Sequence, residues 1–84
     1  MTGAVFEVLL FGPAREATGS ARVSVAVEAP ATAAQVLAAL ERDHPALGPL
    51  LPRARVAVNR HYVDADSPVT PDDEIAIIPP VGGG

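Results

Sequence analysis

The sequence predicts an α+β domain in which one main helix packs across a mixed sheet of four or five strands. Three observations lead to this fold class. The chain of 84 residues begins with two short strand-like segments, continues with one segment of helical periodicity, and ends with further short apolar segments separated by turn residues. Laying one helix across one face of a sheet is the simplest way to bury all of these apolar stripes.

The first two predicted strands form a hairpin. Residues 5–11 (VFEVLLF) are apolar and end at Gly12-Pro13, which predicts a central strand with both faces largely covered. Residues 14–19 predict about one turn of helix ending at a glycine. From Arg22 to Glu28 valine recurs at every second position, so the second strand is predicted to be antiparallel and exposed on one face.

The main helix is predicted to begin after Thr32, which can form a capping box with Gln35. Pro45 disfavours helical geometry in the preceding residue, so the helix is expected to end by His44. Residues at helical spacing form one apolar stripe toward the sheet: Ala33, Val36, Leu37 and Leu40.

The remaining chain predicts a loop and further strands. Residues 49–52 form a loop with buried leucines, and residues 55–59 alternate with Val56 and Val58 inward. Tyr62-Val63 is expected to extend this strand or to pair with it.

The last strand is predicted over residues 74–78, after a type I turn at residues 70–73. A hairpin, a helix and a return strand describe a ubiquitin-like β-grasp. We therefore expect one domain over residues 1–81, with residues 82–84 as a flexible glycine tail.

Composition excludes several classes of function. The hydrophobic content of 49% and the mean hydropathy of +0.28 suit a folded domain. Without cysteine there is no disulfide, thiolate zinc site or cysteine nucleophile. No apolar run approaches the roughly 20 residues of a membrane span and no signal peptide is evident, so we expect a cytoplasmic protein without a membrane partner. The net charge of −4 argues against a nucleic-acid partner.

No catalytic constellation is evident in the sequence. A phosphate loop, a GxSxG elbow and a helical histidine pair are all missing, and His44 and His61 are a weak metal signal. We therefore expect no metal site and no independent enzyme. Residues 61–84 contain five acidic residues and no arginine or lysine, which predicts that the end of the domain near the tail is negatively charged. Turn chemistry and solvation explain these acids more simply than steering toward a basic partner does.

The C-terminus is the most unusual segment. Pro79-Pro80 favours an extended direction that cannot continue a sheet, and three glycines follow Val81. Glycine has no Cβ, so such a chain can enter a narrow channel and its terminal carbonyl can be approached closely. The Gly84 carboxylate needs activation, for which a phosphoanhydride made with ATP in a separate enzyme would serve. A frayed terminus is the plain structural alternative.

The chain resembles the sulfur-carrier small subunit of molybdopterin synthase, the MoaD family of ubiquitin-like proteins, over nearly its whole length. Residues 8–16 (VLLFGPARE) are similar to that family's first strand and short helix, and residues 58–63 (VNRHYV) and 68–81 to its C-terminal block. The Pro-Pro-Val-x-Gly-Gly ending is the most specific element. Here x is Gly82, where the family often has Ser, Thr or Ala.

The resemblance implies a sulfur carrier that is consumed and recharged as the non-catalytic, sulfur-donating subunit of the synthase. Gly84 becomes an acyl-adenylate and then a thiocarboxylate, which donates sulfur for the molybdopterin dithiolene. No cofactor is bound, and ATP is used by the partner that activates Gly84. The implied partners are the large catalytic subunit in a heterotetramer, a ubiquitin-activating-type adenylyltransferase and a sulfur donor protein. Gly82 and Gly83 thread the tail, and the implied docking surface consists of Phe11, Arg15, Ile78, Pro79, Pro80 and Val81.

Three alternatives remain open. Sulfur carriers for thiamine thiazole synthesis or tRNA thiolation use the same terminal thiocarboxylate, although the Pro-Pro-Val spacer and the Arg15-Glu16 turn favour molybdopterin. A ubiquitin-like modifier would pass the same acyl-adenylate to a lysine. A β-grasp interaction module with an inert tail would need no such chemistry.

Overall fold

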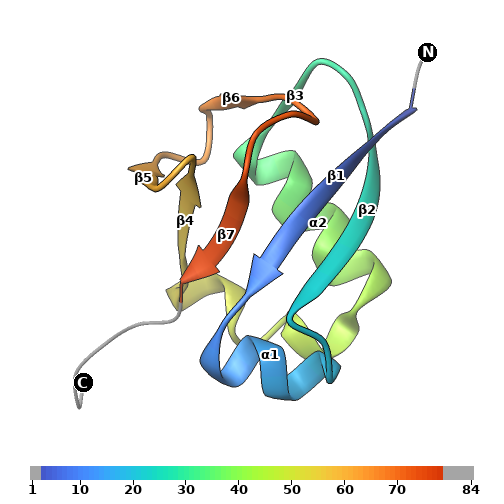
Figure 1. Ribbon diagram of the computed structural model, residues 1–84. Coiled ribbons are helices and arrows are strands. Elements are labelled where there is room, and N and C mark those ends of the chain that lie inside the picture. Colours follow the sequence, from blue (N-terminus) through green and yellow to red (C-terminus); the bar gives the residue numbers. More distant parts are fainter. Residues whose placement is uncertain (1–2, 79–84) are drawn as a thin grey trace.

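A five-stranded mixed sheet with helix α2 (Ala33–Asp43) across one face organises the protein (Figure 1). The computed structural model describes residues 3–78. Its strand order is β2-β1-β7-β4-β5, which confirms the predicted ubiquitin-like β-grasp. The predictions for residues 79–84, including the proline spacer and the glycine tail, lie outside the described residues.

Strands β1 (Gly3–Leu10) and β2 (Arg22–Glu28) are antiparallel, and helix α1 (Gly12–Thr18) connects them. Helix α1 starts earlier than predicted because Gly12 and Pro13 are helical, and it ends at Gly19 in the left-handed conformation (φ 74°). Strand β1 lies inside the sheet as predicted, between β2 and β7.

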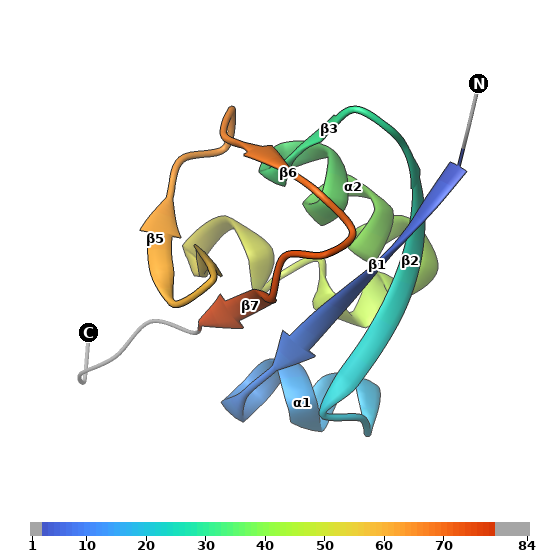
Figure 2. The same ribbon diagram turned by 45° about the horizontal axis from the view of Figure 1, so that its top comes forward.

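The prediction that both faces of β1 are covered is wrong. Only alternate residues of β1 are buried, and Val5 on the other face is 58% exposed. The reason is that α2 packs against a single face of the sheet, and among residues 3–78 no element covers the opposite face (Figure 2). The apolar run of β1 thus serves the core with one face and leaves apolar side chains exposed on the other.

The capping box of α2 is confirmed. The Gln35 N–H donates to the Thr32 hydroxyl, and the Thr32 N–H donates to Gln35 Oε1 at 2.8 Å. The helix ends before His44, as Pro45 predicts. Of the predicted stripe, Leu37 is only partly buried, and Ala39 takes part in the core instead.

Two single-turn 3₁₀ helices, η1 (Pro45–Leu47) and η2 (Leu51–Arg53), lie between α2 and the next strand, and only η2 overlaps the loop predicted over residues 49–52. Strands β4 (Arg55–Val58) and β5 (His61–Val63) then form a hairpin, and β7 (Ile75–Ile78) enters between β1 and β4. The sequence did not predict the small second sheet of β3 (Ala31–Thr32) and β6 (Pro68–Val69). Two-residue strands are too short to show a periodicity.

The core lies between α2 and the inner face of the sheet. Its largest fully buried side chains come from both layers and from η1: Phe6, Val8, Leu10, Val25, Val36, Leu40, Leu47, Ile75 and Ile77. Within residues 3–78, no helix has the length and apolar character needed to cross a membrane.

Candidate functional site

Ile78 is the last residue of β7 and the last residue that the structure describes. Strand β7 runs parallel to β1, with Leu10 opposite Ile77, and antiparallel to β4, with Arg55 opposite Ile78. Phe11 directly follows Leu10, so it lies at the same end of the sheet as Ile78. We call this end, where β1 and β7 finish and β4 begins, the exit end.

The uncovered face of the sheet carries an apolar patch that reaches the exit end. Leu9, Ala76, Ala57 and Tyr62 are aligned on four neighbouring strands. Strand alternation places Phe11 and Ile78 on this same face, next to the row. We call these six residues the outer-face patch.

Two aromatic side chains of the outer-face patch are open to solvent. Tyr62 is 58% exposed and Phe11 46% exposed, whereas Ala57 and Ala76 between them are buried. The Arg55 guanidinium carbon lies 4.3 Å from the centroid of the Tyr62 ring, within cation–π range. Exposed aromatic and arginine side chains are enriched at protein interfaces, so this face has the composition of a docking surface.

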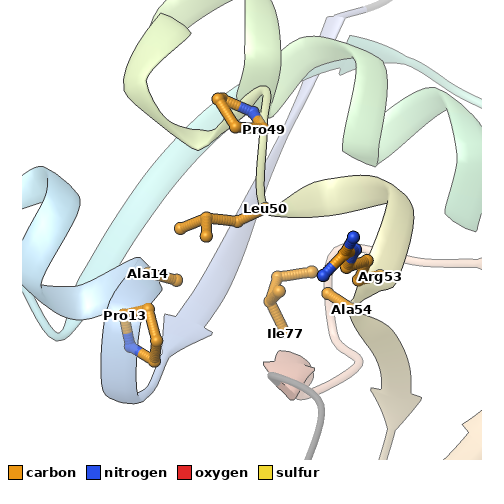
Figure 3. Close-up of a pocket in the computed structure, with 7 residues that line it drawn as sticks. All are labelled: Pro13, Ala14, Pro49, Leu50, Arg53, Ala54 and Ile77. Carbon is orange, nitrogen blue, oxygen red and sulfur yellow. The ribbon is translucent and has the colours of Figure 1, made fainter. Parts of the chain in front are cut away.

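An apolar pocket of about 290 Å³ opens on the other side of the exit end (Figure 3). Helix α1, the segment around η2 and strand β7 each supply part of its wall. Among the described residues that line the pocket, Arg53 is the only charged one. The lining residues are Pro13, Ala14, Pro49, Leu50, Arg53, Ala54 and Ile77.

Charge is distributed differently from the sequence-based expectation. Residues 72–74 precede β7, so their three carboxylates lie at the opposite end of this strand from Ile78. Arg53 and Arg55 instead flank the exit end, and neither forms an ion pair with another described residue. The expectation of a negative end near the tail is therefore wrong for these three acids. A four-residue strand separates its two ends by about 10 Å, so residues 72–74 lie far from Ile78 although they are close to it in sequence.

A polar clamp joins the β4–β5 turn to the start of β7. Asn59, with a left-handed φ of 52°, donates from Nδ2 to Asp73 Oδ1 at 2.9 Å and accepts from the Glu74 N–H at 2.9 Å. The Thr70 N–H donates to Asp73 Oδ2 at 2.8 Å. The bond from the Thr70 backbone, followed by that from Asn59, lowers the pKa of the Asp73 carboxyl.

The structure describes only some of the site residues that the sequence predicts. Phe11 and Ile78 meet at the exit end, and Arg15 is exposed on α1, which begins directly after Phe11. Pro79, Pro80, Val81 and the three glycines lie outside the described residues. Sequence reasoning missed Tyr62, Arg53 and Arg55. Alternation along β4 and β5 could have indicated the outward side chains, but no local signal marks Arg53 as a pocket residue.

Within residues 3–78, no three or more His, Asp or Glu side chains gather in a way that could hold a metal ion. His61 is exposed, with Nδ1 3.0 Å from the Asn59 carbonyl oxygen. The described residues form a sheet in which the central strand β7 ends beside exposed apolar and cationic side chains. This geometry defines the class as ubiquitin-like β-grasp proteins.

The chain belongs to the ThiS family, whose model matches residues 8–84. It is 34% identical to the molybdopterin synthase sulfur carrier subunit of Dictyostelium discoideum, over 94% of this chain and 95% of that protein. Small archaeal modifier protein 1 of Haloferax volcanii has the same fold, with a TM-score of 0.84 and 31% identity. The match covers 96% of this chain and 100% of that chain.

A third similarity is to a chain in the complex of subunits 1 and 2 of the molybdopterin-converting factor of Helicobacter pylori 26695. The TM-score is 0.65 and the identity 26%, with coverage of 96% of this chain and 100% of that chain.

Proposed function

We propose that this protein is the sulfur carrier subunit of a molybdopterin synthase and that Gly84 carries the sulfur. The observation that carries the proposal is the exit end: β7 is held between β1 and β4 and ends beside the outer-face patch, Arg53 and Arg55. In this proposal the surface beside the end of β7 binds each partner in turn, and the terminal group reacts in that partner's active site. The family and the similarity to a sulfur carrier subunit support the same function.

The chemistry follows from the terminal carboxylate. One carboxylate oxygen of Gly84 attacks the α-phosphate of ATP in an adenylyltransferase of the ubiquitin-activating type, and pyrophosphate leaves. The terminal sulfur of a persulfide on the donor protein then attacks the acyl carbon, and AMP leaves. Cleavage of the S–S bond by a thiol frees the thiocarboxylate. Adjacent glycines suit these steps because no Cβ obstructs the approach to the carbonyl.

The main partner we propose is the large catalytic subunit, joined in a heterotetramer. The similarity to a chain from a complex of subunits 1 and 2 supports such a partner. The outer-face patch, with Phe11 and Tyr62 as exposed aromatic anchors, is the surface we assign to docking. This chain binds no cofactor in the scheme, because ATP belongs to the activating partner. Since activation consumes ATP, we propose that this protein acts in the cytoplasm.

Intact mass spectrometry of the protein isolated from its host tests the proposal. We expect a fraction whose mass gain equals the exchange of one oxygen for one sulfur, and we expect a chain lacking Gly84 to lack that fraction. Adding the charged protein to a large subunit and the pterin precursor should yield molybdopterin. A charged protein that supplies thiazole synthesis or tRNA thiolation, but never molybdopterin, would assign the same chemistry to another pathway.

A ubiquitin-like modifier is the second candidate, because small archaeal modifier protein 1 is 31% identical and has a TM-score of 0.84. In that reaction a lysine amine attacks the Gly84 acyl-adenylate and AMP leaves. Incubation with ATP and host extract, followed by proteolysis, would then yield lysine side chains joined to the C-terminal glycines. Mass gain without such conjugates favours the carrier, and conjugates without mass gain favour the modifier.

A further inference from the structure

Strand β2 is an open edge of the main sheet. It pairs only with β1, and within residues 3–78 no other strand lies on its outer side (Figure 2). Its seven residues contain no proline. A long edge strand of this kind presents a row of unpaired N–H and C=O groups that can pair with another strand.

The backbone groups that point outward can be identified by residue. The Leu10 N–H donates to the Ala21 carbonyl at 2.8 Å, so Ala21 uses its groups toward β1. Hydrogen-bonded positions alternate along an antiparallel pair, which turns the groups of Arg22, Ser24, Ala26 and Glu28 outward. Arg42 confirms this direction, because its Nη2 donates to the Ala26 carbonyl from outside the sheet at 3.3 Å.

We propose that β2 is a self-association edge, at which two copies of this chain pair antiparallel around a two-fold axis through Val25. In this register Arg22 of each copy lies opposite Glu28 of the other, and Ser24 lies opposite Ala26. Every outward-pointing residue then meets an outward-pointing residue. The two main sheets join into one continuous sheet, and the interface is closed because each copy uses the same strand.

Sequence and backbone parity select this register over its neighbours. A slip by one residue would oppose outward groups with inward ones and would move the valines to the other face. A slip by two residues would pair Arg22 with Ala26 and leave Glu28 without a cation opposite it. Only the central register forms two Arg–Glu cross-strand pairs, which favour antiparallel association.

The apolar side chains of β2 are also complementary between the two copies in this register. Val23, Val25 and Val27 share the face toward α2, so in the pair Val25 meets its own copy and Val23 lies opposite Val27. A shallow depression of about 480 Å³ between this strand and α2 has Val27, Ala38 and Ala39 in its lining. The two alanines are small, which leaves room there for Val23 of the second copy.

The existing contacts of the edge are compatible with pairing. The Ala26 carbonyl that accepts from Arg42 has a second acceptor site for the incoming strand. Arg22 and Glu7 form an exposed ion pair at 3.5 Å, with the Arg22 side chain 66% exposed and accessible to a second carboxylate. The edge lies across β1 from β7, so pairing leaves the exit end uncovered, and the proposal does not depend on the proposed function.

Sedimentation equilibrium of the full chain up to about 1 mM tests the proposal. We expect a monomer–dimer equilibrium that Arg22→Glu and Glu28→Arg each weaken by about tenfold or more, and that the double variant restores. The single variants move the net charge in opposite directions, so overall repulsion cannot explain a shared loss. Glu16→Arg, on exposed α1, is the matched control and should dimerise normally.

A backbone variant tests the strand pairing itself. Ala26→Pro removes an N–H that points away from β1, a position at which edge strands tolerate proline, and should abolish the dimer while circular dichroism shows a folded monomer. Hydrogen exchange of the wild-type chain gives a second readout that needs no variant. The Ser24 and Ala26 amides should become protected as concentration rises.

Three results would overturn the proposal. A chain that stays monomeric up to about 1 mM has no such edge. A dimer that survives Ala26→Pro, or that Phe11→Ala abolishes, uses another surface. A double variant that fails to recover the dimer refutes the Arg22–Glu28 register.

Discussion

Asn59 determines how two turns meet. Its left-handed φ of 52° suits asparagine better than most residues, and its side chain bonds both Asp73 and Glu74 across 14 and 15 positions of sequence. Its own N–H donates to the Glu74 carbonyl at 2.8 Å. Since Glu74 immediately precedes β7, this residue helps to hold the start of the strand that carries the chain to the exit end.

Replacing Asn59 should separate backbone strain from hydrogen bonding. We expect Asn59→Ala to lower the free energy of unfolding by about 1–3 kcal/mol, because it loses two side-chain bonds and places a Cβ residue in a left-handed turn. Asn59→Gly loses the bonds but tolerates the turn, so its loss should be smaller. Urea denaturation measures both. Unchanged stability in Asn59→Ala would mean that the clamp contributes nothing.

Asp73 should make stability depend on pH. Its folded pKa is lowered by hydrogen bonds from Thr70 and Asn59, so the carboxylate stabilises the fold above its unfolded pKa of about 3.9. That contribution is lost as pH falls from there through the folded pKa. We expect Asp73→Asn to flatten the decline of unfolding free energy below about pH 4. Asp72→Asn, next to it but exposed, should retain the wild-type profile.

At the scale of elements, helix α2 supplies one wall of the core and β7 connects the core to the exit end. Leu40 on α2 is fully buried, and on β7 the inward Ile77 is buried while the outward Ile78 is half-buried. One short strand thereby joins the packed interior to the outer-face patch. Destabilising the core is therefore expected to loosen the outer-face patch as well.

Leu40→Ala should destabilise the protein by about 2–5 kcal/mol, because the lost side chain leaves a cavity between α2 and the sheet. Leu37→Ala is the matched control on the same helix. Leu37 is only partly buried, so its truncation should cost clearly less. Thermal or urea unfolding compares the two variants. Equal losses would show that the helix does not present its faces as described.

At the scale of the whole molecule, the surfaces to which we assign docking and self-association lie apart. The exit end and the outer-face patch lie at one end of the uncovered face, and the open β2 edge lies across β1 from β7. Val5 is as exposed as Tyr62, at 58%, but it lies near the start of β1, away from the exit end. This arrangement supplies an internal control for docking.

Truncating the aromatic anchors should weaken binding to the large subunit. We expect Phe11→Ala and Tyr62→Ala each to raise the Kd by about tenfold or more, because buried aromatic anchors carry most of an interface's energy. Val5→Ala removes an equally exposed apolar side chain and should leave the Kd unchanged. Isothermal titration calorimetry measures all three. A loss with Val5→Ala alone would place docking at the other end of β1.

Removing Gly83 and Gly84 should abolish sulfur transfer with little change in the thermal midpoint, since glycines have no side chain to bury. Gly82→Ala should retain both transfer and stability, because the family that this chain resembles often has Ala at that position. Molybdopterin assembly with purified partners provides the activity readout. Normal synthesis by the truncated chain would refute the carrier function.

Local sequence patterns predicted most of the elements, and the chemistry proposed for the terminus rests on its residue types. Alternation in β2, the capping box of α2 and the turn before β7 are local patterns, and they predicted those elements with small errors at the ends. Three features depend instead on packing in the folded chain: β1 leaves one face exposed, Phe11 lies at the same end as Ile78, and Arg53 and Arg55 rather than residues 72–74 flank the exit end. The physical reason is that periodicity reports which side of an element is apolar, whereas strand order, strand direction and register arise from packing between segments distant in sequence.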